Sequence, residues 1–228
     1  SVWSESSFAM IKLLIVKDWQ VYQKQLAGYL AGLVLALGLI GSGSSWSFNA
    51  GALLLLVLLV STGFFAIGQI VLNERKEHTL PFVMSLPVTP TDFYSAKLLA
   101  GILVYLVPFL LVVLTTAFLV LYTALPDGLL VYAILIYVFM LTSHCVALSA
   151  AMAIESEGWN ILVQMALMTV LSPFILWVGS LQSIAANLLT DNIVWSPTVL
   201  AVLAGEMLVV AAVLGWTQWS HARKTSFL

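Results

Sequence analysis

Six long stretches of this chain are almost free of charged residues, and a soluble fold could not bury all of them. The stretches are Leu26–Ile40, Ala50–Leu72, Leu98–Tyr122, Gly128–Ile154, Trp159–Ser180 and Pro197–Trp219, and only the last contains an Asp, Glu, Lys or Arg residue. A helix needs about 20 mostly apolar residues to cross the hydrocarbon of a bilayer. The sequence therefore predicts an all-α integral membrane protein, in which one domain over residues 1–228 has six transmembrane helices. The first stretch is short, so we expect that helix to extend backward toward Tyr22 or to be tilted against its neighbours.

The basic residues determine the predicted orientation of the helices. All eight Lys and Arg residues lie before the first span, between the second and third spans, or after the last one. Because Lys and Arg are retained on the cytoplasmic side of a membrane, both termini are predicted to be cytoplasmic. We expect a multi-pass protein of the cytoplasmic (inner) cell membrane.

Composition also excludes several classes of function. The net charge of −2, with only eight basic residues, argues against a nucleic-acid partner. Cys145 is the only cysteine, so the chain has no intramolecular disulfide and no thiol metal cluster. The chain contains neither a phosphate-binding Gly-rich loop with Lys nor a metallohydrolase or serine-hydrolase motif. We therefore expect no catalytic residues, no metal site and no cofactor in this chain.

The segment 1–25 is interpreted as a helix that lies in the inner membrane interface. Apolar side chains recur there at helical spacing, at Phe8, Ile11, Ile15, Trp19 and Tyr22. Lys17, Gln20 and Lys24 occupy the opposite side, as in interfacial amphipathic helices. The alternative is an ordinary charged lead-in to the first span.

The longest predicted extramembrane segment, residues 73–97, contains a short helix with an apolar surface. This helix begins near Thr79 with Pro81 in its first turn, and Pro87 ends it. The residues that we assign to it as a docking site for a partner protein are Thr79, Leu80, Pro81, Phe82, Val83, Met84 and Leu86. An apolar surface in a cytoplasmic loop indicates either such a docking site or a helix that folds back onto the lipid surface. Thr89 and Pro90 then begin the helix that continues into the third span.

The same segment resembles the cytoplasmic segment of ABC-2-type permeases, which are the transmembrane subunits of ABC exporters. The resemblance is carried by the mixed-charge run Asn73–Leu80, by Met84–Pro90, and by Phe93 and Ala96–Leu99 at the entry to the third span. His78 stands where the family usually has glycine. Six spans, an interfacial N-terminal helix and a long loop after the second span extend the similarity over the whole chain.

The resemblance implies a half-transporter that works with other subunits. The permease would form a homodimer or heterodimer and would sit on separate nucleotide-binding subunits, which hold ATP and Mg²⁺ and hydrolyse the ATP. The helix at 79–86 would be the coupling helix that contacts those subunits. The outer segment 181–196 would contain short re-entrant helices, and the substrate would be lipid-like, amphipathic or otherwise hydrophobic.

Two polar residues inside the spans are candidates for the transport pathway. Glu206 lies near the middle of the last span, where an ionised carboxylate costs at least roughly 2.5 kcal/mol. His144 lies in the fourth span. For both residues a structural role is the alternative, with Glu206 protonated or hydrogen-bonded in the packing and His144 satisfied by a neighbouring carbonyl or hydroxyl group.

Two other classes of function remain open at this point. One is a proton-coupled secondary transporter that uses Glu206 and His144, which would normally contain an inverted repeat, and the sequence has no convincing internal repeat. The other is a membrane scaffold or immunity-like protein that transports nothing.

Overall fold

The computed structural model describes residues 2–42, 44–72, 90–154 and 156–222, and every regular element in these ranges is a helix. In chain order the elements are α1 (Val2–Gly41), α2 (Ser45–Ile67), the π-helical turn η1 (Gly68–Leu72), α5 (Pro90–Tyr122), α6 (Leu129–Ala153), α7 (Glu157–Ser180), α8 (Gln182–Ala185) and α9 (Pro197–Ala222). For the described residues, this confirms the predicted all-α fold.

Within the described residues, five helices are long and apolar enough to cross a membrane. They are α2 together with η1, then α5, α6, α7 and α9. The first predicted span corresponds to a shorter apolar part of α1, Gln25–Gly41. The structure thus supports a multi-pass membrane protein, and the sixth crossing stays a prediction.

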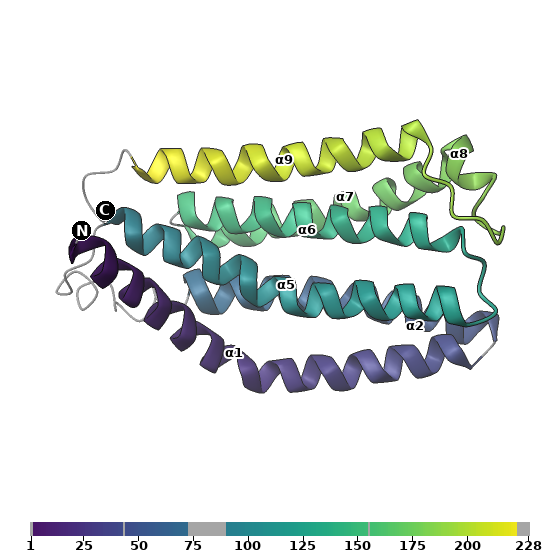
Figure 1. Cartoon of the computed structure of the whole chain (residues 1–228), viewed down its shortest axis with the longest axis horizontal. Coiled ribbons are helices and arrows are strands. Elements are labelled where there is room, and N and C mark those ends of the chain that lie inside the picture. Colours follow the sequence, from purple (N-terminus) through teal and green to yellow (C-terminus); the bar gives the residue numbers. More distant parts are fainter. Residues whose placement is uncertain (1, 43, 73–89, 155, 223–228) are drawn as a thin grey trace.

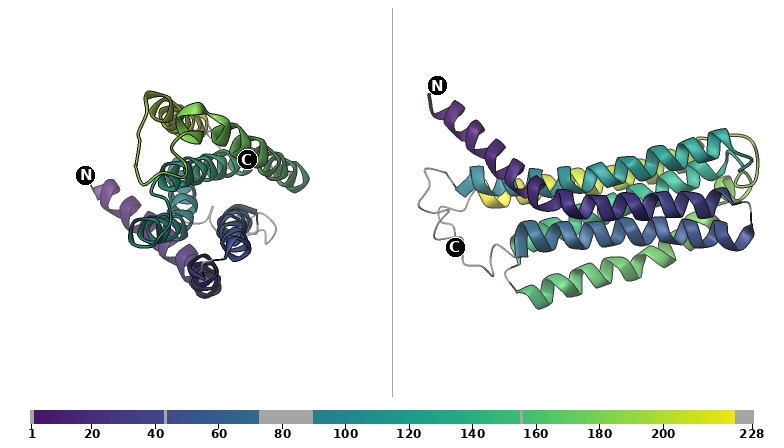
Figure 2. Two further views of the ribbon diagram at one scale, coloured as in Figure 1. Left: turned by 90° about the vertical axis from the view of Figure 1, so that its right-hand side faces the viewer. Right: turned by 90° about the horizontal axis from the view of Figure 1, so that it is seen from below.

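The predicted interfacial helix and the first span form one continuous helix, α1. Figures 1 and 2 show that α1 bends, and that its first part turns away from the other helices. Only the part that follows the bend runs along the bundle, where α1 packs against α2 and α5.

The long helices lie side by side with two distinct ends (Figure 1). At one end, here named the terminal end, lie the start of α1 and the end of α9, together with the end of η1 and the start of α5. The opposite end, here named the connection end, holds the end of α1 and the start of α2, together with the links at residues 123–128 and 181–196. The end of η1 and the start of α5, which are consecutive described elements, therefore both lie at the terminal end.

Helix α6 is the centre of the bundle, and α7 and α9 lie at its periphery. In an apolar 18-residue stretch of α6, 56% is buried inside the protein, against 11% in the corresponding stretches of α7 and α9. Helix α6 packs against α5, α7 and α9. The peripheral helices therefore present most of their apolar surface to the outside, as lipid-facing helices do.

The crossing of α1 and α2 depends on a glycine. A Cβ atom added at Gly51 would lie 2.7 Å from the backbone carbonyl oxygen of Ala36 and 2.6 Å from Cγ1 of Ile40. Both Ala36 and Ile40 are buried. Only a residue without a side chain lets the two backbones approach this closely.

The connection at 181–196, which we predicted to contain short re-entrant helices, includes one short helix, the four-residue α8. Ile184 of α8 is buried with Val131, Val178 and Val199, so this connection covers the ends of α6, α7 and α9. The backbone N–H of Gly128 donates to the carbonyl of Thr190 at 3.0 Å, which ties the connection to the start of α6. Its re-entry into a membrane stays a prediction.

Exposed aromatic side chains occur at both ends of the bundle. Trp46 at the start of α2 and Tyr122 at the end of α5 are exposed at the connection end, and Trp177 lies near the end of α7 at the same end of the bundle. Trp159 at the start of α7, with Trp216 and Trp219 near the end of α9, marks the terminal end. Tryptophan and tyrosine are enriched at the two interfaces of a membrane, so these positions are typical of a bundle that spans one.

Candidate functional site

His144 is held inside the bundle by α5 and α2. Its imidazole is buried, with 4% of the residue exposed, and its Nε2 lies 3.2 Å from the carbonyl oxygen of Gly101. The ring stacks on Tyr105 with a centroid separation of 4.0 Å and an interplanar angle of 9°. A backbone carbonyl thus partners one of the two ring nitrogens, and a role of His144 in a transport pathway stays a prediction.

The other ring nitrogen of His144 points toward α2. A Cβ atom added at Gly63 would lie 3.2 Å from Nδ1 and 3.4 Å from a ring carbon of Tyr105, so glycine makes room for the stacked pair. Because a carbonyl can only accept, Nε2 must carry the proton in this hydrogen bond, and in the neutral ring Nδ1 is left as an acceptor. Among the described residues Nδ1 has no hydrogen-bond partner.

Helix α7 contributes a second polar side chain near His144. The buried residues of α7 are Asn160, Gln164 and Val178, so two of these three are polar. The Nδ2 of Asn160 donates to the carbonyl of Ile154 at 3.0 Å and closes the turn between α6 and α7. Gln164, one turn further on, has 4% of its surface exposed, and its Oε1 has no partner among the described residues.

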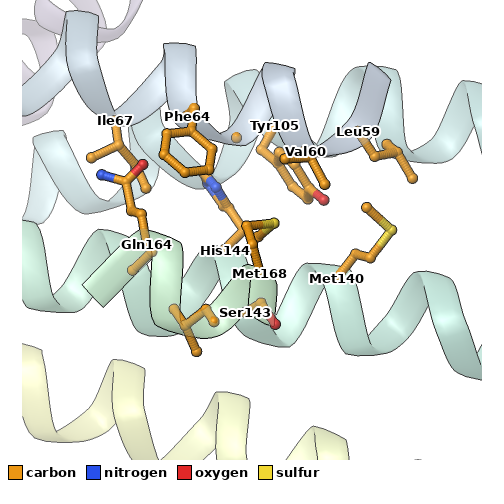
Figure 3. Close-up of a pocket in the computed structure, with 13 residues that line it drawn as sticks. Leu59, Val60, Phe64, Ile67, Tyr105, Met140, Ser143, His144, Gln164 and Met168 are labelled. Atoms are coloured by element: carbon orange, nitrogen blue, oxygen red, sulfur yellow. The ribbon is translucent and has the colours of Figure 1, made fainter. Parts of the chain in front are cut away.

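His144, Gln164 and Tyr105 line one pocket, here named the polar pocket. Four helices contribute to it, with Gly63 and Phe64 from α2, Tyr105 from α5, His144 from α6 and Gln164 from α7. Figure 3 shows these side chains around a common space, with Phe64 beside the imidazole. Its free volume of about 20 Å³ accommodates one water molecule.

The polar pocket presents hydrogen-bond acceptors in an apolar surrounding. Apart from His144 Nδ1 and Gln164 Oε1, most of the lining is aliphatic, aromatic or thioether. A buried polar group without a partner costs about 1–3 kcal/mol. The pocket is therefore suited to a small hydrogen-bond donor, such as water or a hydroxyl group, between α6 and α7.

Glu206 is buried separately from the polar pocket. It is 7% exposed, and neither carboxylate oxygen has a hydrogen-bond partner among the described residues. Val199 of α9 packs with Val131 and Leu135 near the start of α6, while Leu214 packs against a cluster near the end of α6. Glu206 lies midway between these two contacts, level with the middle of α6. The structure thus buries both predicted pathway residues but does not bring them into one pocket.

The predicted docking residues at 79–86 lie outside the described residues. Lys97, which follows that segment at the start of α5, is described and is buried, with 4% exposure. Nearby, Gln218 of α9 donates from Nε2 to the hydroxyl oxygen of Ser95 at 3.0 Å. This contact joins α9 to the first turns of α5 at the terminal end.

Sequence reasoning missed Gln164 and Asn160. Their spacing of four residues puts both on one face of a helix, and a polar pair in an otherwise apolar span indicates a face that is turned toward the bundle. Tyr105 was also missed, because nothing local distinguishes it from other aromatic residues in the spans.

Within the described residues, no group of three or more His, Cys, Asp or Glu side chains could hold a metal ion. Comparison of the chain with models of known protein families, with curated proteins and with solved structures gave no match.

Proposed function

We propose that this chain is the membrane-embedded permease subunit of an ATP-driven exporter of the ABC-2 type, and that ATP is hydrolysed on a separate nucleotide-binding subunit. The observation that carries the proposal is that η1 ends and α5 begins at the same end of the bundle, the terminal end. In the sequence, most of the segment that resembles the family lies between these two elements. A partner that binds this segment would contact that end of the bundle.

The charges of the described helices support a cytoplasmic position for that end. Lys12 and Lys17 lie in the half of α1 that begins at the terminal end, Lys24 lies near the middle of that helix, and Lys97 lies near the start of α5. Three of these four lysines thus lie toward the terminal end by their position along the helices. By the positive-inside tendency, the terminal end faces the cytoplasm, where ATP is available, and α1 together with the five long apolar helices crosses the membrane six times.

The substrate in this proposal is lipid-like, amphipathic or otherwise hydrophobic. The peripheral helices α7 and α9 leave most of their apolar surface outside the bundle. A second copy of the permease, or a partner permease, would cover part of this surface. The route for the substrate would then lie between two permeases, not through the narrow polar pocket of one.

The test is purification of the tagged chain from its own membranes in a mild detergent. We expect an ATPase with a phosphate-binding loop to co-purify and vanadate-sensitive ATP hydrolysis to accompany it. The double variant Phe82→Asp/Leu86→Asp should lose both, because charged side chains disrupt an apolar docking surface. Asn192→Asp, at an exposed position of the connection end, is the control and should keep both. Equal ATPase recovery from all three proteins would refute the proposal.

A secondary transporter is the second candidate, and the burial of Glu206 and His144 favours it. Intramembrane ionisable residues often belong to proton relays. The two candidates separate in vesicles that contain the purified chain alone. Uptake driven by a pH gradient, without ATP and without any other subunit, would support the secondary transporter and would contradict the exporter.

A further inference from the structure

A second and larger cavity lies toward the connection end of the bundle, between α1, α2, α5 and α6. It is named the apolar cavity here, and its free volume is about 160 Å³. Its wall includes the buried side chains Ile40, Leu55, Val120 and Ile136, one from each of the four helices. The polar pocket has different walls, so the two spaces are separate.

The chemistry of the wall indicates an apolar occupant. Three lining residues carry hydroxyl groups, and each of these groups has a partner. The hydroxyls of Thr116 and Tyr137 lie 3.0 Å apart, and Tyr132 donates to the carbonyl of Ile175 at 3.2 Å. No side-chain polar atom of the wall therefore needs a ligand. A polar ligand would lose its hydrogen bonds to water and would gain none from these side chains.

The size of the cavity also favours an occupant. A cavity of about 150 Å³ with Leu, Ile and Phe walls stays dry and binds benzene. An empty space of this kind leaves the atoms of its wall without contacts on one side, and that loss is unfavourable. A few methylene groups would restore these contacts without forming a hydrogen bond.

The cavity is not fully enclosed by buried residues. Most of its lining residues are only partly buried, among them Phe48, Leu119 and Leu125. The exposed aromatics Trp46 and Tyr122 stand next to this region in sequence and mark the level of the lipid headgroups. Below that level, the molecules that surround a membrane helix are acyl chains.

We propose that the apolar cavity holds part of an acyl chain of a bilayer lipid, which inserts between α2, α5 and α6 from the leaflet at the connection end. The lipid is a structural ligand that fills the junction of four helices. This inference rests on membrane insertion and not on ATP-driven transport, so its failure would leave the proposed function untouched.

The test uses phosphatidylcholine vesicles in which a fraction of the lipid carries a diazirine midway along one acyl chain. After reconstitution of the full chain and irradiation, peptide mass spectrometry locates the covalent adducts. Leu114 and Phe118 are 65% and 59% exposed on α5 and report ordinary contact with lipid. We expect adducts at these two positions and also at Val120 and Ile136, which are 3% and 7% exposed.

A variant with a filled cavity gives the matched control. Ala133 lines the cavity from α6, and Ala133→Phe should reduce the adducts at Val120 and Ile136 at least fivefold while those at Leu114 stay unchanged. If this variant fails to insert, Ala52→Phe fills the same cavity from α2. Two results would overturn the proposal. The first is labelling confined to Leu114 and Phe118 in the unaltered protein, a result that needs neither variant to fold. The second is labelling of Val120 and Ile136 that persists when the cavity is filled.

Discussion

Replacement of Gly51 by alanine tests the helix crossing on which the connection end depends. In the structure, the added Cβ would meet the carbonyl oxygen of Ala36 at 2.7 Å and the backbone nitrogen of Ile40 at 3.1 Å. Neither atom can move aside by a change of rotamer, so α1 and α2 must separate. Overpacking of this kind typically costs about 1–3 kcal/mol.

The matched control is Gly38→Ala on α1, where an added Cβ would have nothing within 4 Å. Both replacements gain about 0.8–1.0 kcal/mol because alanine is the better helix former. We therefore expect Gly38→Ala to raise the free energy of unfolding by nearly 1 kcal/mol, and Gly51→Ala to lower it by up to about 2 kcal/mol. The difference between the two variants, about 1–3 kcal/mol, is independent of helix propensity.

The assay is equilibrium unfolding by sodium dodecyl sulfate in mixed micelles, followed by circular dichroism. Gly51→Ala combined with Ile40→Ala separates the two kinds of clash, because it removes the Ile40 side chain and keeps the carbonyl of Ala36. The loss caused by Gly51→Ala should persist in that background, since the carbonyl belongs to the backbone. Equal stability of Gly51→Ala and Gly38→Ala would refute the reasoning and would mean that the helices do not approach closely at Gly51.

Three further predictions concern the polar residues and the orientation. Gln164→Met keeps the length of the side chain and removes an acceptor without a partner, so it should raise the free energy of unfolding by about 1 kcal/mol. A loss of stability would contradict the burial of its Oε1. If transport falls in the same variant, Gln164 belongs to the pathway. If Glu206 lines the pathway, Glu206→Gln should alter transport or its pH dependence without lowering the melting temperature. If Glu206 is structural, Glu206→Gln should leave transport unchanged, and Glu206→Leu should lower the free energy of unfolding by about 1–3 kcal/mol. Normal activity and stability in both variants would mean that the residue is not buried as described. In a Cys145→Ala background, a cysteine at position 192 should react with an impermeant thiol reagent from outside and a cysteine at position 85 should not, and external labelling at position 85 would disprove a cytoplasmic terminal end.

The positions of the long helices could be predicted from the sequence because Asp, Glu, Lys and Arg are absent from every apolar stretch except the last, which contains only Glu206. Helices α5, α6, α7 and α9 match the predicted spans closely at their connection ends, where a link that contains polar or turn-forming residues interrupts the pattern. The N-terminal part was harder. Segment 1–25 and the first span differ in composition, yet α1 continues through both, because a change of surroundings does not require a break in the backbone hydrogen bonds.

The candidate site could be predicted only in part. His144 and Glu206 were recognisable as polar residues in apolar surroundings, and the structure buries both. Their separation could not be predicted, because a span with apolar residues on all sides has no polar face that would fix its rotation about its own axis. Gln164 lines the same pocket as His144 only because of the rotation of α7. The apolar cavity is likewise a result of how four helices fit together and has no sequence signal.

The aromatic side chains at the two ends of the bundle also specify a membrane thickness. Trp159 and Trp177 are 18 residues apart in α7, which corresponds to about 27 Å at 1.5 Å per residue. That length is slightly below the hydrocarbon thickness of a typical bilayer, about 30 Å. Long-chain lipids would therefore stretch beyond both tryptophans, and the bilayer would have to thin around α7 at a cost of fractions of a kcal/mol per Å. The chain should accordingly be most stable in bilayers of shorter lipids and should collect in the thinner regions of a membrane of mixed composition.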